Sequence, residues 1–87
     1  MTRQSRMLSR ILAATADQNI RFEGLRTLLL GLGFQERVRG SHHIFTREGV
    51  AEILNLQPGG GGMAKPYQVR QVRDAIVRYR LAGEQQT

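Results

Sequence analysis

The 87-residue chain contains no cysteine. This absence excludes disulfide bonds, thiolate nucleophiles and zinc sites built on cysteine, so the fold depends on packing alone. Long hydrophobic runs are also missing. The longest mostly apolar stretch, residues 25–34, is interrupted by arginine, threonine and glycine, and it is shorter than the roughly 20 residues that span a bilayer. We therefore expect no transmembrane segment, and because the basic N-terminus is a poor secretory signal, we expect a cytoplasmic protein.

The short length predicts a single small domain over residues 1–87. A chain of this size buries only about 60 to 65% of its unfolded surface. A deep cavity for a large cofactor is therefore not expected, and any chemistry should take place on an open face.

Acidic residues are few. The chain has seven Asp and Glu and 13 Lys and Arg, which gives a formal net charge of +6. Lys65 is the single lysine, and all other basic residues are arginines. Guanidinium groups bind phosphate oxygens in bidentate geometry and stack on bases, so this composition suits a nucleic-acid partner. Arginine-rich codon usage and an ordinary solvated surface would give the same composition, since charge bears on association and not on fold.

Helical periodicity predicts two helices in the first part of the chain. Apolar residues recur at helical spacing in residues 5–15, which predicts a short amphipathic helix. In residues 22–32 they form one stripe of a clearer second helix. Gly33 follows this stripe, and Phe34 can fold back on the last turn, which is typical of a left-handed C-terminal cap.

Three short strands are predicted next. Residues 34–39 alternate like a half-exposed strand, residues 42–47 are rich in β-branched and aromatic side chains, and residues 50–57 form the third strand. The turns at 39–41 and 47–49 are too short for the crossover that parallel strands need. The sequence therefore predicts a three-stranded antiparallel meander.

The segment 58–62, PGGGG, excludes regular structure and predicts a flexible loop tip or mobile arm. Pro66 suits the first position of a helix, and the apolar spacing predicts the last helix over 66–81, with Gly83 as its stop and 82–87 as a polar tail. This order of elements predicts an α+β domain whose helices cover one face of the sheet and leave the other face open.

The two histidines, His42 and His43, are adjacent and follow the turn residues Gly40 and Ser41. Neighbouring strand residues point to opposite faces, so the two rings are not expected to share one metal or one phosphate. His43 lies on the side of Phe45, which favours burial of that side, although either face can be the covered one. The carboxylates are scattered without the spacing of a metal site. A histidine on the open face can transfer a proton near neutral pH.

The arginines best placed to follow a phosphate backbone lie on the first strand and the last helix: Arg37, Arg39, Arg70, Arg73 and Arg80. A surface of this size suits RNA recognised by shape and phosphate contacts. The alternative is an ordinary solvated helix in which Arg70 pairs with Asp74.

The segment 32–45, LGFQERVRGSHHIF, resembles the centre of the HicA toxin family. That family has an LGF-type turn after a helix and a strand pair that carries Gly-Ser-His followed by alternating apolar residues. The resemblance covers about residues 22–81 and is most specific at the Gly-Ser-His junction. It implies a double-stranded-RNA-binding-like fold, α-β-β-β-α, to which residues 1–21 add an N-terminal helical extension.

The resemblance also implies a function. Family members are metal-independent mRNA endoribonucleases of type II toxin–antitoxin systems, and a HicB antitoxin neutralises them by covering the catalytic face. Carried over by position, the catalytic residue is His42, Gly40 and Ser41 shape the turn that presents it, and His43 faces inward. No metal or other cofactor is implied. With the single lysine included, the residues expected to bind RNA are Arg37, Arg39, Lys65, Arg70, Arg73 and Arg80.

A second hypothesis is a non-catalytic RNA- or ribosome-binding module that uses the same basic face. The apolar stripe of the N-terminal helix suits either capping of the domain or self-association, so a homo-oligomer is possible but not predicted. Where many family members carry Pro-x-His near the end of the third strand, this chain reads Asn55-Leu56-Gln57-Pro58.

Overall fold

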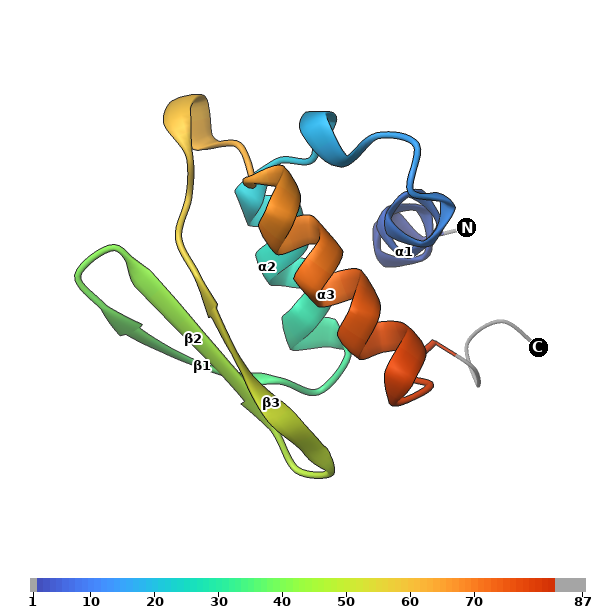
Figure 1. The fold of residues 1–87 in the computed structure, drawn as a ribbon, viewed down its shortest axis with the longest axis vertical. Helices are drawn as coiled ribbons and strands as arrows, with labels where there is room; N and C mark the ends of the chain where they lie inside the picture. Colours follow the sequence, from blue (N-terminus) through green and yellow to red (C-terminus); the bar gives the residue numbers. More distant parts are fainter. Residues whose placement is uncertain (1, 83–87) are drawn as a thin grey trace.

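Helices and strands follow one another in the predicted order. The computed structural model describes residues 2–82. Its helices are α1 (Arg3–Ala13), α2 (Phe22–Gly31) and α3 (Pro66–Arg78). Its strands are β1 (Gln35–Arg39), β2 (His42–Arg47) and β3 (Val50–Leu56). All three helices lie on one side of the sheet (Figure 1), which confirms the α+β prediction.

The end of α2 has the cap that the sequence predicts. Gly33 adopts a left-handed φ of +96°. The backbone N–H of Gly33 donates to the carbonyl of Leu30 at 3.1 Å, and that of Phe34 donates to the carbonyl of Leu29 at 3.1 Å. These two bonds form a Schellman motif, and they turn the chain directly into β1.

The other helix ends differ slightly from the prediction. α1 begins earlier, because the Thr2 hydroxyl caps it by accepting a 3.0 Å bond from the Ser5 N–H. α3 ends at Arg78 and not at residue 81, because Arg80 adopts a left-handed φ of 54° and the Leu81 N–H folds back on α3. Apart from Ala82, which is buried, the predicted polar tail and the Gly83 stop lie outside the described residues.

The sheet is an antiparallel meander in the order β1-β2-β3, as predicted. Arg39 pairs with His42 across the tight turn between β1 and β2, where Gly40 takes a φ of +59°. His43 pairs with Leu56 of β3. The β2–β3 register shifts further along, between Phe45 and Arg47, so the register of this pair does not follow from the turn alone.

One apolar cluster fills the space between the helices and the sheet. The strands contribute Phe45, Leu54 and Leu56 from alternate positions, which places the intervening residues on the opposite face. Leu25 of α2 and Val72 of α3 are among the fully buried residues that cover these strands. The sheet therefore has a covered face and an open face. No helix within residues 2–82 has the length and apolar character needed to cross a membrane.

Helix α1 packs against α2 and α3 and buries Leu8 and Ile11. Its contact with α2 is close because Gly24 and Gly31 face it. A Cβ atom at Gly24 would lie 2.6 Å from the Cε atom of Met7. In this structure α1 therefore caps the helical layer.

The glycine-rich segment forms the loop tip that is one of the two predicted alternatives. The chain turns at Gly60–Gly62 with left-handed φ values of +67° at Gly61 and +77° at Gly62, so the segment is not regular structure, as predicted. The Gly59 N–H donates to the Met63 carbonyl at 2.7 Å, and the Ala64 N–H donates to the Ile20 carbonyl at 2.8 Å. These bonds tie the base of the loop to the segment before α2. The loop is a closed tip and not a free arm (Figure 1).

Candidate active site on the open sheet face

His42 is the first residue of β2 and is exposed on the open face of the sheet. Phe45, three positions further along β2, is fully buried on the covered face. Because side chains alternate along a strand, His43 lies on the covered side with Phe45. The predicted separation of the two histidines is confirmed.

Asn55 of β3 holds the His42 ring. The Nδ1 atom of His42 lies 3.0 Å from the Oδ1 atom of Asn55. An amide oxygen only accepts hydrogen bonds, so Nδ1 is the donor in this contact, and in the neutral ring the lone pair is then on Nε2. A neutral imidazole with an exposed Nε2 is able to act as a general base.

The turn that presents His42 is fixed by Gln57. The Nε2 atom of Gln57 donates to the Ser41 hydroxyl at 2.7 Å. The backbone N–H of Gln57 donates to the Oε1 atom of Gln68 at 3.3 Å, and Gln68 is only 2% exposed. The turn, the end of β3 and the start of α3 are therefore linked. Ser41 has a hydrogen-bonding role here in addition to its predicted role in the turn.

Arg37 and Arg39 lie on the same open face as His42. In the β1–β2 register Arg39 pairs with His42 and Arg37 pairs with Ile44, so both arginines share the phase of His42. Both are exposed, and within residues 2–82 neither forms an ion pair. Their guanidinium groups are available to an anion bound next to His42.

The other predicted RNA-binding residues lie in α3 or next to its ends. Lys65 immediately precedes α3, at the same end of the sheet as the Gln57–Gln68 bond, and Arg70 is exposed in the second turn of α3. Arg80 follows the opposite end of α3, which is roughly 20 Å long. There the neighbouring Tyr79 contacts the start of β3, whereas His42 faces its end. The structure does not bring Arg80 near His42.

Arg73 is held by a different group from the one expected. Its guanidinium donates to both carboxylate oxygens of Asp17, at 2.9 and 3.1 Å, and to the Ile11 carbonyl at 3.2 Å. The Asp17 carboxylate raises the pKa of Arg73. Within residues 2–82, Arg70 does not form the ion pair with Asp74 that the alternative of a solvated helix includes. Arg73 therefore joins α3 to the segment after α1, and it does not face the open side of the sheet.

On the covered face His43 belongs to a polar cluster. Its Nδ1 atom lies 2.7 Å from Oε2 of Glu36, and the Nε atom of Arg26 donates to both Glu36 oxygens at 2.8 and 2.9 Å. The Arg26 hydrogen bond, assisted by His43, lowers the pKa of Glu36. The His43 ring also packs edge-on against Phe22, with 4.9 Å between the ring centroids. These contacts indicate a structural role for His43.

Asn55 and Gln57 were not predicted as parts of the site. A signal was present, since they alternate with the buried Leu54 and Leu56 and therefore lie on the open face. They also lie within residues 55–58, where many members of the family that this chain resembles carry Pro-x-His. The missing information was the β2–β3 register, which brings Asn55 to His42.

Within the described part of the chain, no three or more His, Asp or Glu side chains are grouped so that they could hold a metal ion. Comparisons of the whole chain with protein-family models, curated proteins and solved structures found no match. The geometry of the open face and the Gly-Ser-His junction are the features of this chain that bear on its function.

Proposed function

We propose that this protein is a HicA-like toxin, a cytoplasmic endoribonuclease that cleaves mRNA without a metal ion and uses His42 as its catalytic residue. The observation that carries the proposal is the exposed His42 ring. Its Nδ1 atom is hydrogen-bonded to Asn55, and Arg39 is its neighbour on β1 in the strand register. The order α2-β1-β2-β3-α3 supports a double-stranded-RNA-binding-like fold, with α1 as the extension.

The proposed reaction is transfer of a phosphodiester to the neighbouring ribose 2′-hydroxyl. Nε2 of His42 removes the 2′ proton, and the 2′ oxygen forms a bond to phosphorus while the bond to the 5′ oxygen breaks. Water protonates the leaving 5′ oxygen, so the products end in a 2′,3′-cyclic phosphate and a 5′-hydroxyl. Arg37 and Arg39 stabilise the charge that builds on the phosphoryl oxygens. General base catalysis of this kind contributes about 10²- to 10⁴-fold.

The open face is suited to a single RNA strand that lies on the surface, and less to a substrate that is enclosed in a pocket. His42 and Asn55 are exposed, and Ile53 on the same face is 66% exposed. The arginines supply phosphate contacts, and the apolar side chain offers a surface for an unpaired base. A HicB-type antitoxin with an acidic surface would neutralise the enzyme by covering this face.

The direct test is cleavage of a labelled single-stranded RNA by the full chain in the presence of EDTA. We expect discrete fragments with 2′,3′-cyclic phosphate ends from the wild type and none from His42→Gln, whose unfolding midpoint should match the wild type because the ring is exposed. His43→Gln is the matched control. It should cleave at the wild-type rate per folded molecule while losing stability.

A non-catalytic RNA- or ribosome-binding module is the second candidate, because the same two arginines would bind RNA without a reaction. If the wild type and His42→Gln both shift RNA in a salt-sensitive manner and neither produces fragments, catalysis is refuted and this candidate is favoured. Equal cleavage by the wild type and a folded His42→Gln protein would refute the assignment of His42.

A further inference from the structure

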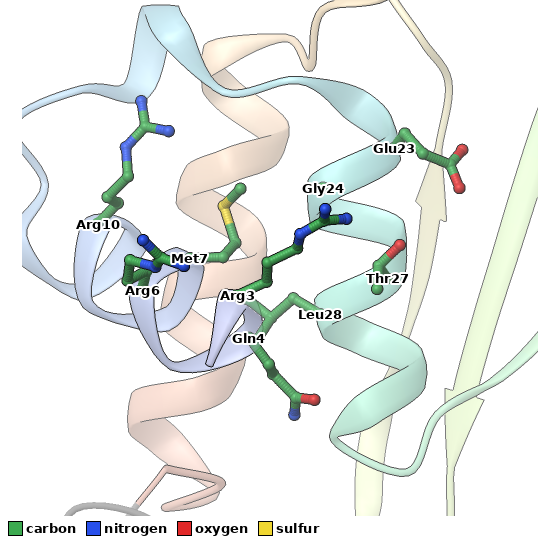
Figure 2. A pocket seen from close by; sticks show the side chains of 9 residues that line it. All are labelled: Arg3, Gln4, Arg6, Met7, Arg10, Glu23, Gly24, Thr27 and Leu28. Atoms are coloured by element: carbon green, nitrogen blue, oxygen red, sulfur yellow. The ribbon is translucent and has the colours of Figure 1, made fainter. Parts of the chain in front are cut away.

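A groove of about 410 Å³ runs between α1 and α2, on the helical layer and away from the open sheet face (Figure 2). Its apolar lining is provided by Met7, Gly24 and Leu28. Three arginines follow one another along α1 on its border, namely Arg3, Arg6 and Arg10. The proposed function makes no use of this groove.

The positive charge of the border is not balanced by its surroundings. Within residues 2–82 neither Arg3 nor Arg6 forms an ion pair, and Arg10 donates only to the Asn19 carbonyl, at 2.9 Å. The single carboxylate in the lining, Glu23, is paired with Arg26 at 2.9 Å. Arg3 is also the first residue of α1, whose first turn has no acidic residue, and a cation there is unfavourable for the helix dipole. Arg3 therefore does not serve the stability of α1.

The floor of the groove suits an apolar side chain. Gly24 lies in the first turn of α2 and presents no side chain to the groove. The flexible thioether of Met7 lies over it, and a methionine can adapt to a ligand of variable shape. Leu28 is 1% exposed and forms a firm base.

We propose that the α1–α2 groove binds an acidic amphipathic helix of a partner protein. Apolar side chains of that helix would replace water above Met7, and its carboxylates would pair with Arg3 and Arg6. The arginines recur about once per helical turn, which matches the spacing of carboxylates along one side of a helix laid parallel to α1. RNA fits this surface less well, because the lining contains no aromatic side chain on which a base could stack.

The test uses the full chain and a fluorescent helical peptide that carries leucines along one face and glutamates beside them. We expect binding with amide shift changes confined to α1 and α2. Two control peptides, one with lysine in place of glutamate and one with serine in place of leucine, should not bind. Arg3→Glu combined with Arg6→Glu should weaken binding about tenfold or more while α1 stays helical, since acidic residues suit its first turn.

The matched control is Arg37→Glu combined with Arg39→Glu, which changes the net charge equally on the opposite face. We expect it to leave peptide affinity within about twofold, because exposed charges more than a Debye length of about 10 Å away are largely screened. Thr27→Glu, an exposed change on the α2 side of the groove, should also weaken binding.

Equal losses in the two double variants would overturn the proposal, as would equal binding of the serine peptide. Displacement of the peptide by a short RNA with shifts at the same amides would overturn it in favour of nucleic acid. A dimer in sedimentation whose interface protects these amides would overturn it in favour of a second copy of this chain. RNA cleavage by the Arg3→Glu/Arg6→Glu protein is measured in parallel. The groove does not contribute to His42, so either proposal can fail without the other.

Discussion

The Nδ1 atom of His42 and the Oδ1 atom of Asn55 lie 3.0 Å apart and join β2 to β3 on the face that the helices leave open. The bond sets both the orientation and the tautomer of the ring, because an amide oxygen cannot donate. Gln57, two residues further on, holds the preceding turn through Ser41. Asn55 of β3 therefore positions the imidazole, and Gln57, directly after β3, holds the turn that precedes it.

Asn55→Leu tests this positioning. We expect the cleavage rate to fall by up to about 100-fold with little change in RNA affinity, since a displacement of about 1 Å from the productive geometry has an effect of that size. Nitrogen NMR should show a mixture of His42 tautomers in the variant and the Nδ1–H form in the wild type. Ile53→Leu, on the same face of β3, is the control and should retain both the rate and the tautomer. An unchanged tautomer in a folded Asn55→Leu protein would contradict the role of Asn55.

Much of the fold was predictable because its signals are local. The Gly33 cap follows from a glycine placed just beyond a helical stripe, and the opposite orientations of His42 and His43 follow from strand alternation. Short turns dictated the antiparallel meander. Each of these features depends on residues only a few positions apart.

The remainder depends on contacts between distant parts of the chain. Asn55 reaches His42 only through the β2–β3 register, which shifts between Phe45 and Arg47. Arg73 bonds Asp17, which lies 56 residues earlier, although the sequence suggested an RNA contact for this arginine. Neither periodicity nor spacing contains this information, because it arises from how the elements pack.

Glu36→Gln should make stability less dependent on pH. Arg26 lowers the pKa of Glu36 in the folded protein, whereas an unfolded glutamate has a pKa of about 4.3. The stabilisation that ionised Glu36 gives the folded protein is therefore fully present above the unfolded pKa of this residue. It is lost as the pH falls through the folded pKa. We expect the variant to be about 1–3 kcal/mol less stable at neutral pH.

Urea unfolding at a series of pH values measures this effect. The difference between wild type and Glu36→Gln should shrink as the pH falls below about 4. Glu23→Gln is the control, because the Glu23 side chain is 71% exposed and its pairing with Arg26 contributes little. A difference between wild type and Glu36→Gln that stays constant down to strongly acidic pH would contradict the assigned cause.

Arg73→Met should destabilise the helical layer. Methionine keeps the aliphatic stem of Arg73 but lacks the guanidinium that hydrogen-bonds Asp17 and the Ile11 carbonyl. The change therefore leaves the Asp17 carboxylate, which is only 17% exposed, without its partner. We expect a loss of about 1–3 kcal/mol in chemical denaturation. Arg70→Met, on the exposed side of the same helix, should change stability by no more than about 0.5 kcal/mol. Equal effects would show that the Asp17 pair does not stabilise the fold.

Salt dependence distinguishes the arginines that contact RNA from those that only add charge. Each phosphate contact on a single strand contributes a slope of about −0.7 to the plot of log association constant against log salt concentration. In a His42→Gln background, which keeps the RNA intact, Arg39→Gln should therefore reduce the magnitude of the slope by about 0.7. Arg80→Gln removes the same charge at the far end of α3, so it should leave the slope unchanged even though the sequence suggested an RNA contact there. The same slope change in both variants would mean that RNA also follows α3, and the bound strand would then have to extend beyond the open face of the sheet.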